Sequence, residues 1–212
     1  MAETANDGTG GAIYLLTKEQ HAIRQQMQKH PTLGSVGYIK NFRGELDITL
    51  NKTAITDTDT GYRLIRGRNI GFYSMVDAGK AEYVSPSFVE KTAKCRYIGQ
   101  PRLACQQIAN MAKKRRICFS PIPADHVLGN SCNFVCVEPN GDGVDLYFLM
   151  GVLNSSLIDG YFRATSSNNH INNYEIDALP IPVSYGKKTA FPASSAGCWK
   201  HTICRWPIRS RS

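Results

Sequence analysis

The chain lacks the features that mark several common protein classes. None of its 212 residues belong to an apolar run approaching the eighteen or so that cross a bilayer. Its first eleven residues are small, polar and acidic, which is not the pattern of a secretory leader. We therefore expect a cytoplasmic protein with no membrane partner. The apolar share of 42% and the charged share of 20% are ordinary for a globular domain, which excludes disorder throughout.

Paired cysteine spacings are also missing. The seven cysteines are scattered at positions 95, 105, 118, 132, 136, 198 and 204. Two pairs are close in sequence, Cys132 with Cys136 and Cys198 with Cys204, but neither has the two-residue spacing of a zinc knuckle. His126 and His201 do not complete such a set. We expect reduced thiols and no metal site.

The sequence contains no recognisable nucleotide-binding turn or hydrolase triad. Gly8 and Gly10 have the spacing of the first two glycines of a dinucleotide turn, but no strand precedes them and Ile13 occupies the third position. Ser120 and the pair Asp125-His126 lack a third partner for nucleophilic catalysis.

Metal-dependent nuclease chemistry has only superficial support. Glu45 and Asp47 lie on one face of a predicted strand, whereas Lys52 lies beyond its end. Acidic pairs on strands are usually surface charges or turn partners. We therefore predict no catalytic residue, which leaves open whether the chain is an enzyme.

Acidic residues are absent from two stretches of the chain. The stretch 183–212 carries six basic residues, which leaves only +2 of the net charge of +8 for the remainder. The stretch 91–124 carries eight, namely Lys91, Lys94, Arg96, Arg102, Lys113, Lys114, Arg115 and Arg116. Such a cluster can neutralise phosphates, although a charge run is more commonly a solvated face. Interleaved Tyr, Gln and Asn residues favour contact with nucleic acid.

Hydrophobic periodicity predicts an α+β fold. Thr17 and Gln20 have capping-box spacing, so a helix is expected over 18–29 and ends at Pro31. Alternation predicts a strand at 45–50, a hairpin through the turn 56–61, and further strands at 95–98, 103–108, 116–120 and 133–137. These elements form a mixed, mostly antiparallel sheet core with a few packed helices.

The most informative segment runs from Leu146 to Pro182. Apolar residues recur at spacings of three and four, which predicts one long buried helix near 145–163. Residues 166–173, the amide loop, then hold seven hydrogen-bonding side chains in eight positions. Two interpretations remain open for this loop: a solvated connection, or contact with bases and phosphates.

Three groups of short motifs along the chain resemble those of a known family. Residues 150–158, 161–163 and 179–182 read MGVLNSSLI, YFR and LPIP, and residues 44–49 and 61–70 read GELDIT and GYRLIRGRNI. Together with RRICFS at 115–120, they resemble the Taq-type C-terminal specificity domain, or target-recognition domain, of type II restriction-modification adenine-specific DNA methyltransferases. The resemblance covers residues 34–182.

This resemblance implies sequence-specific binding to double-stranded DNA. The parent enzyme would transfer a methyl group from S-adenosylmethionine to adenine, with a methyltransferase or endonuclease partner domain. The Asn-Pro-Pro-Tyr motif and the cofactor turn of that enzyme are absent, so we expect no S-adenosylmethionine in this chain. Residues 1–33 are expected to be an N-terminal helical segment and 34–182 the recognition domain. Residues 183–212 are expected to be an irregular basic tail, either frameshifted or disordered, or an authentic nucleic-acid-binding tail.

The general rules of DNA recognition suggest which residues make contact. We expect phosphate contacts from Arg66, Arg68, Lys113, Lys114 and Arg115. For base edges we choose Asn168, Asn169, His170, Asn172, Arg102 and Gln106. Bracing a turn is the alternative role for Arg68. The alternative functions are a non-enzymatic RNA-binding or single-strand-binding module, a protein-interaction module, and an inert gene remnant.

Overall fold

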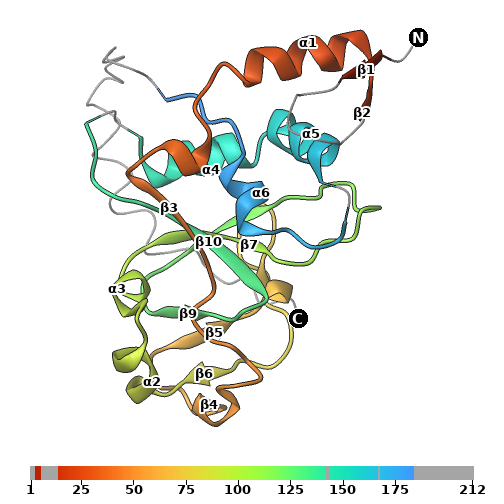
Figure 1. The fold of residues 1–212 in the computed structure, drawn as a ribbon. Helices are drawn as coiled ribbons and strands as arrows, with labels where there is room; N and C mark the ends of the chain where they lie inside the picture. The colour runs from red at the N-terminus through yellow and green to blue at the C-terminus, as the bar shows by residue number, and fades with distance from the viewer. Residues whose placement is uncertain (1–2, 6–13, 142–143, 167, 184–212) are drawn as a thin grey trace, which may run out of the picture.

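The computed structural model describes residues 3–5, 14–141, 144–166 and 168–183, and has the expected α+β architecture (Figure 1). One four-stranded sheet is antiparallel throughout and has the order β3-β10-β7-β8. Its strands are β3 (Ile39–Arg43), β7 (Arg102–Gln106), β8 (Phe119–Ile122) and β10 (Cys132–Val137). These strands bring together residues that lie up to 98 positions apart, Ile39 and Val137.

A second four-stranded sheet has the order β4-β6-β5-β9. Its strands are short: β4 (Ile55–Thr56), β5 (Arg63–Ile65), β6 (Tyr83–Val84) and β9 (His126–Leu128). Only the pairing of β5 with β9 is parallel in this sheet. Two further strands, β1 (Glu3–Ala5) and β2 (Tyr14–Leu16), form a separate antiparallel pair.

Helices cover both ends of the molecule (Figure 1). At one end lie α1 (Lys18–Met27), α4 (Leu146–Leu153), α5 (Ser156–Thr165) and α6 (Asn173–Asp177). At the other end lie α2 (Pro86–Lys91) and α3 (Cys95–Ile98). Three short 3-10 turns are η1 (Leu33–Ser35), η2 (Lys52–Ala54) and η3 (Gly67–Asn69). No helix in the described part of the chain is both long and apolar enough to span a bilayer.

The sequence of strand β10 is apolar almost throughout because both faces of the strand are covered. Phe134 and Cys136 face the second sheet, in a cluster with Ile65 and Leu128. Val135 faces the opposite way, into the cluster formed with α4, α5 and α6. A strand covered on both faces requires apolar residues at successive positions, because both sets of side chains are removed from water.

The helix expected at 18–29 is confirmed as α1. Thr17 Oγ1 accepts a hydrogen bond from the Gln20 amide at 3.2 Å, and the Thr17 amide donates to Gln20 Oε1 at 3.0 Å. The chain after α1 then pairs with the end of the described chain: the Leu33 amide donates to the Leu179 carbonyl, and the Ile181 amide to the Pro31 carbonyl, both at 2.8 Å. The domain boundary predicted at residue 33 therefore falls in a segment that packs against residues 179–181.

The single long helix predicted near 145–163 is instead two helices. Asn154 ends α4, and Ser155 begins α5 by accepting a hydrogen bond from the Ile158 amide. At this break the Asn154 side chain binds the backbone of Phe119, a strand residue far away in the sequence. Nor is the region continuously buried, since Tyr147, Phe148 and Leu157 are exposed.

Three strand predictions also need correction. Residues 45–50 form a bridge at Leu46 followed by a turn, in which Asp47 Oδ1 accepts the amides of Thr49 and Leu50. Residues 95–98 form the helix α3. The expected hairpin through 56–61 does not form, because β4 and β5 both pair with β6. The strands expected at 103–108, 116–120 and 133–137 appear as β7, β8 and β10 with shifted ends.

Candidate nucleic-acid interface

Four of the residues predicted to contact DNA gather around one hollow. This hollow has a volume of about 260 Å³ and is lined by Arg66, Gly67, Arg68, Gln106, Ile108 and Ser131. Gln106 connects the segments around it: its Nε2 donates to the Gly67 carbonyl at 2.7 Å, and its Oε1 accepts from Lys113 Nζ at 3.1 Å. The side chains of Arg66, Arg68, Gln106 and Lys113 thus come from three separate segments to one place.

The turn that carries the two arginines is built around Asn69. This buried side chain accepts a hydrogen bond from the Arg66 amide and donates to the carbonyls of Val76 and Ala78. The Gly67 amide donates to Ser131 Oγ at 2.9 Å. A Cβ at Gly67 would lie 2.9 Å from the Ser131 carbonyl oxygen, so the close approach of these two segments requires glycine.

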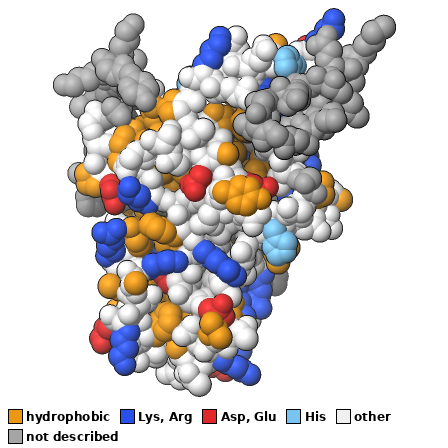
Figure 2. All heavy atoms as spheres, viewed as in Figure 1, with side chains coloured by type: hydrophobic (Ala, Val, Ile, Leu, Met, Phe, Trp, Pro, Cys, Tyr) orange, Lys and Arg blue, Asp and Glu red, His pale blue; other side chains and the backbone are white. Residues whose placement is uncertain are grey.

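Glu82 partly neutralises this basic pair. Its two carboxylate oxygens bind Arg66 at 2.6 Å and Arg68 at 3.2 Å. The bracing role considered for Arg68 therefore has support, and Arg66 and Arg68 are less available to phosphates than free arginines. Basic and acidic side chains are interspersed on the face shown in Figure 2, without a continuous basic stripe.

The amide loop lies against the segment that leaves β7. The Ala109 amide donates to the Asn169 carbonyl at 2.9 Å, and the Ile171 amide donates to the Gln107 carbonyl at 2.7 Å. Ile108 and His170 form an antiparallel bridge between the two segments. The predicted readers Asn168, Asn169 and His170 are all exposed, and His170 pairs with Ile108, which lines the hollow.

Two amide side chains of this loop have structural partners. Asn169 Oδ1 accepts the Met111 amide at 3.1 Å. Asn172 precedes α6, and its Nδ2 donates to Glu175 Oε2 at 3.0 Å. Asn168 Oδ1 accepts the nearby His170 amide. Among the described residues, the Nδ2 groups of Asn168 and Asn169 and the His170 ring have no hydrogen-bond partner, so they are the groups most available to a ligand.

Lys113, Lys114 and Arg115 lie in a loop over 111–116, the basic loop. Lys113 and Lys114 are exposed, while Arg115 is half-buried and donates to the Asn154 carbonyl at 2.8 Å. No ion pair joins any of the three to a carboxylate among the residues that the structure describes. Their charge is therefore not cancelled locally.

The basic loop is held by residues that sequence reasoning assigned only to a buried helix. Asp159 Oδ1 accepts the amides of Arg116 and Ile117 at 2.8 and 3.1 Å. Arg163 binds Asp159 at 2.9 Å and also donates to the Lys113 carbonyl. The sequence does indicate this role: in the segment from Asn154 to Arg163, polar residues interrupt an otherwise apolar helix face.

Arg116 links the basic loop to the amide loop. Its guanidinium is buried, lies 5.3 Å from the centre of the Phe162 ring, and donates to the Asn168 carbonyl at 2.6 Å. Burial lowers the pKa of Arg116, more than its acidic neighbours raise it. The two loops thus form a connected unit with a buried cation beneath it.

Arg102 cannot serve as the base reader that we expected. Its side chain is 0% exposed, forms an ion pair with Glu45, and donates to the His126 carbonyl. Burial raises the pKa of Glu45, against the lowering effects of Arg102 and the Leu128 amide. A charged pair that lies inside the protein needs its partner, so removing either residue would leave an unpaired buried group.

The nuclease alternative receives no geometric support. Glu45 is buried against Arg102, Asp47 caps a turn, and Lys52 lies in η2. Among the described residues, no group of three or more His, Cys, Asp or Glu side chains could hold a metal ion. Cys95, Cys105, Cys118, Cys132 and Cys136 are free, whereas Cys198 and Cys204 lie outside the described residues, with the rest of the predicted tail from 184 onward.

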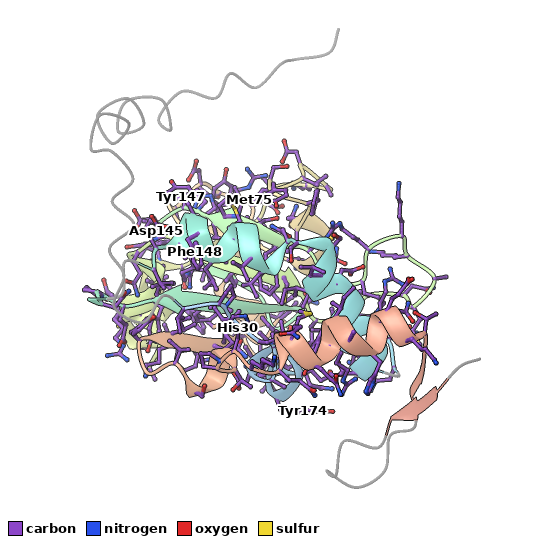
Figure 3. All side chains as sticks on the ribbon, turned by 90° about the horizontal axis from the view of Figure 1, so that it is seen from above. His30, Met75, Asp145, Tyr147, Phe148 and Tyr174 are labelled. Carbon is purple, nitrogen blue, oxygen red and sulfur yellow. The ribbon has the colours of Figure 1, made fainter. Side chains whose placement is uncertain are left out.

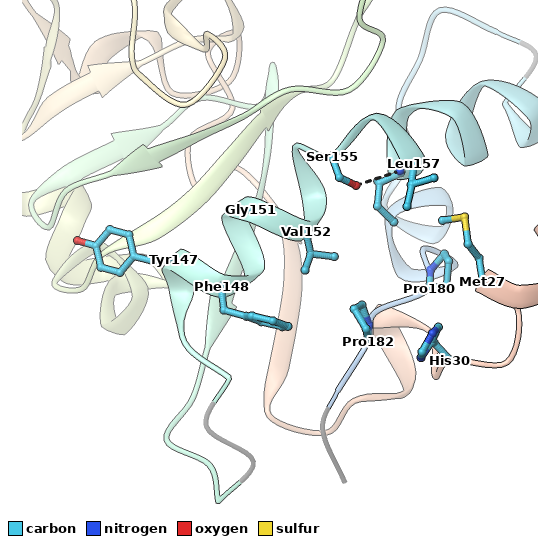
Figure 4. A pocket seen from close by; sticks show the side chains of 11 residues that line it. Met27, His30, Tyr147, Phe148, Gly151, Val152, Ser155, Leu157, Pro180 and Pro182 are labelled. Carbon is cyan, nitrogen blue, oxygen red and sulfur yellow. Dashed lines mark hydrogen bonds between the residues drawn. The ribbon is translucent and has the colours of Figure 1, made fainter. Parts of the chain in front are cut away.

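A second, larger hollow is apolar and contains none of the predicted site residues. This apolar groove has a volume of about 560 Å³ and lies between the end of α1, helix α4 and the segment 180–182 (Figure 4). Phe148 points toward Pro182 across it, whereas Tyr147 points away. His30 and Phe148 both line this groove, and Figure 3 labels them in the view from above.

Comparison with known proteins identifies no family. No protein-family model matches the chain, and no curated protein matches its sequence. The function must therefore be argued from the chemistry of the hollow and the two loops.

Proposed function

We propose that this chain is a sequence-specific double-stranded DNA-binding domain of the target-recognition type. The proposal rests on one observation: direct hydrogen bonds join the basic loop to the amide loop and to Gln106, which lines the hollow together with Arg66 and Arg68. Cationic side chains position a protein on phosphates, and amides or arginines at the same edge read bases. Both kinds of group are present on one contiguous surface.

The roles of the residues follow from their availability. Lys113, Lys114 and Arg115 contact phosphates, because no acid among the described residues pairs with them. Asn168 and His170 read base edges, while Gln106 supports this surface by binding the Gly67 carbonyl and Lys113. Arg66 and Arg68 contribute less, because Glu82 holds both.

The wider biological role extends this proposal. The parent protein is a cytoplasmic restriction-modification enzyme that methylates adenine, with a methyltransferase or endonuclease partner domain. S-adenosylmethionine belongs to that catalytic part, and we expect this chain to bind DNA without it.

The salt dependence of binding tests the proposal. Lys114→Ala removes one exposed charge from the basic loop, and Lys29→Ala removes one exposed charge beyond α1 as the matched control. Each lost phosphate contact reduces the slope of log K against log salt by about one. We expect that reduction for Lys114→Ala alone, measured by fluorescence anisotropy with a labelled duplex at several salt concentrations.

Selection from a randomised duplex pool then identifies the target sequence. With that target, Asn168→Ala should lose roughly 1 to 3 kcal/mol of binding free energy and should bind random DNA as the unsubstituted chain does. Failure to enrich any sequence would refute the proposal. Preferential competition by single strands would favour the RNA-binding or single-strand alternative, and no binding would favour a gene remnant or a protein-interaction module.

A further inference from the structure

Two adjacent aromatic side chains are exposed next to the basic loop. Phe72 and Tyr73 lie in a tight turn over residues 70–76, the aromatic turn, and are 45% and 42% exposed. Their ring centroids are 4.4 Å apart in an edge-to-face arrangement. Exposed aromatic rings of this size are costly to hydrate, which makes a paired ledge of them a candidate contact surface.

The aromatic turn is held firmly and carries backbone strain. Ser120 Oγ donates to the Gly71 carbonyl at 2.7 Å and accepts the Gly71 amide at 2.9 Å. Tyr73 has φ of 62°, a left-handed conformation that is rare for a bulky residue. Such a conformation persists only when surrounding contacts enforce it, and it presents the Tyr73 ring to solvent.

The neighbours of this pair connect it to the proposed DNA surface. The guanidinium of Arg115 lies 4.4 Å from the centre of the Phe72 ring. Gln106, which lines the hollow, donates from its Nε2 to the Ile70 carbonyl at 3.3 Å, at the start of the aromatic turn. The two rings are similarly exposed, but Arg115 lies over the Phe72 ring, whereas no cation among the described residues lies over the Tyr73 ring.

We propose that Tyr73 stacks on an unpaired or extruded base of the bound DNA, with Phe72 as its support. This inference rests on the proposed DNA-binding function and adds a preference for locally unpaired duplex. Every base offers a π face, and an aromatic ring beside uncancelled cations matches the combination of base and phosphate. Stacking requires no sequence readout, so it acts in addition to the contacts of the amide loop.

The test compares a fully paired duplex with the same duplex carrying one unpaired 2-aminopurine. The unsubstituted chain should bind the duplex with the unpaired 2-aminopurine roughly 5- to 150-fold more tightly than the paired duplex, which is the range that stacking of one base provides. It should also quench the 2-aminopurine fluorescence. Tyr73→Phe keeps the ring and should retain both effects.

The decisive variant is Tyr73→Asn, which removes the ring. Asn adopts left-handed backbone readily, so this variant should fold at least as well as the parent chain. It should lose the preference and the quenching while binding the paired duplex normally. Phe148→Asn is the matched control, since Phe148 is 43% exposed but lies in the apolar groove on α4; it should behave as the parent chain.

The possible failures are distinguishable. Equal affinity of the parent chain for both duplexes, as expected if the aromatic pair serves a protein partner, would overturn the stacking inference alone. An unchanged preference in Tyr73→Asn would overturn it as well. Absence of binding to either duplex would overturn the DNA-binding function together with it.

Discussion

The side chain of Asn154 should be among the most important polar groups for the stability of this fold. It is 1% exposed, and it joins the break between α4 and α5 to strand β8. Its Oδ1 accepts the Phe119 amide at 2.8 Å, and its Nδ2 donates to the Phe119 carbonyl at 2.9 Å. Asn154→Ala removes both hydrogen bonds at once.

The two backbone groups of Phe119 are affected differently. Its carbonyl retains the Tyr73 amide at 3.3 Å, but its amide loses the partner that Asn154 supplied. A buried donor without a partner costs about 1 to 3 kcal/mol. The small cavity left by the amide group adds to this, so we expect the free energy of unfolding to fall by about 2 to 4 kcal/mol. Total stabilities of about 5 to 15 kcal/mol leave the variant folded.

Urea unfolding followed by circular dichroism measures this change. The transition midpoint should fall while the slope stays the same, since the surface exposed on unfolding is unchanged. Asn168→Ala is the control, because the Asn168 side chain is exposed and, among the described residues, bonds only to the His170 amide, while its carbonyl is kept; the free energy of unfolding should change by about 0.5 kcal/mol or less. The reasoning would be refuted if Asn154→Ala were as stable as the parent chain, or if both variants lost equal stability.

The remaining predictions concern charge, thiols and the cofactor. Glu82→Gln should release Arg66 and Arg68, raise DNA affinity and steepen its salt dependence by about one unit in anisotropy titrations; an unchanged slope would place both arginines away from phosphates. Burial raises the pKa of Cys132 and Cys136 to about 12, so the folded chain keeps protons that the unfolded chain releases. The free energy of unfolding should therefore decline as pH rises from about 9 toward 12, by up to about 1.4 kcal/mol per thiol per pH unit. In Cys136→Ala, the midpoint of urea unfolding should decline less steeply with pH. Calorimetry with S-adenosylmethionine should detect no saturable binding; a one-to-one isotherm would reveal a cofactor site.

Much of the fold and part of the candidate site could be predicted from local sequence. The capping box of Thr17 and Gln20 lies within four residues, and the helix it begins is present as α1. Likewise, the cluster of basic residues without nearby acids around Lys113 and Lys114, and the run of polar side chains in the amide loop, can be read directly from the sequence. The α+β class followed from the same local periodicities.

Only the tertiary structure decided which of these groups are available. Arg102 is buried against Glu45, 57 residues away, and at the break between α4 and α5 Asn154 binds Phe119, 35 residues away. Glu82 holds Arg66 across a separation of 16 residues. Such pairings depend on how the two sheets and the helices pack, and no local pattern encodes them. Sequence fixes the chemical groups and their local conformation, whereas long-range packing determines whether a charge faces a carboxylate or the solvent.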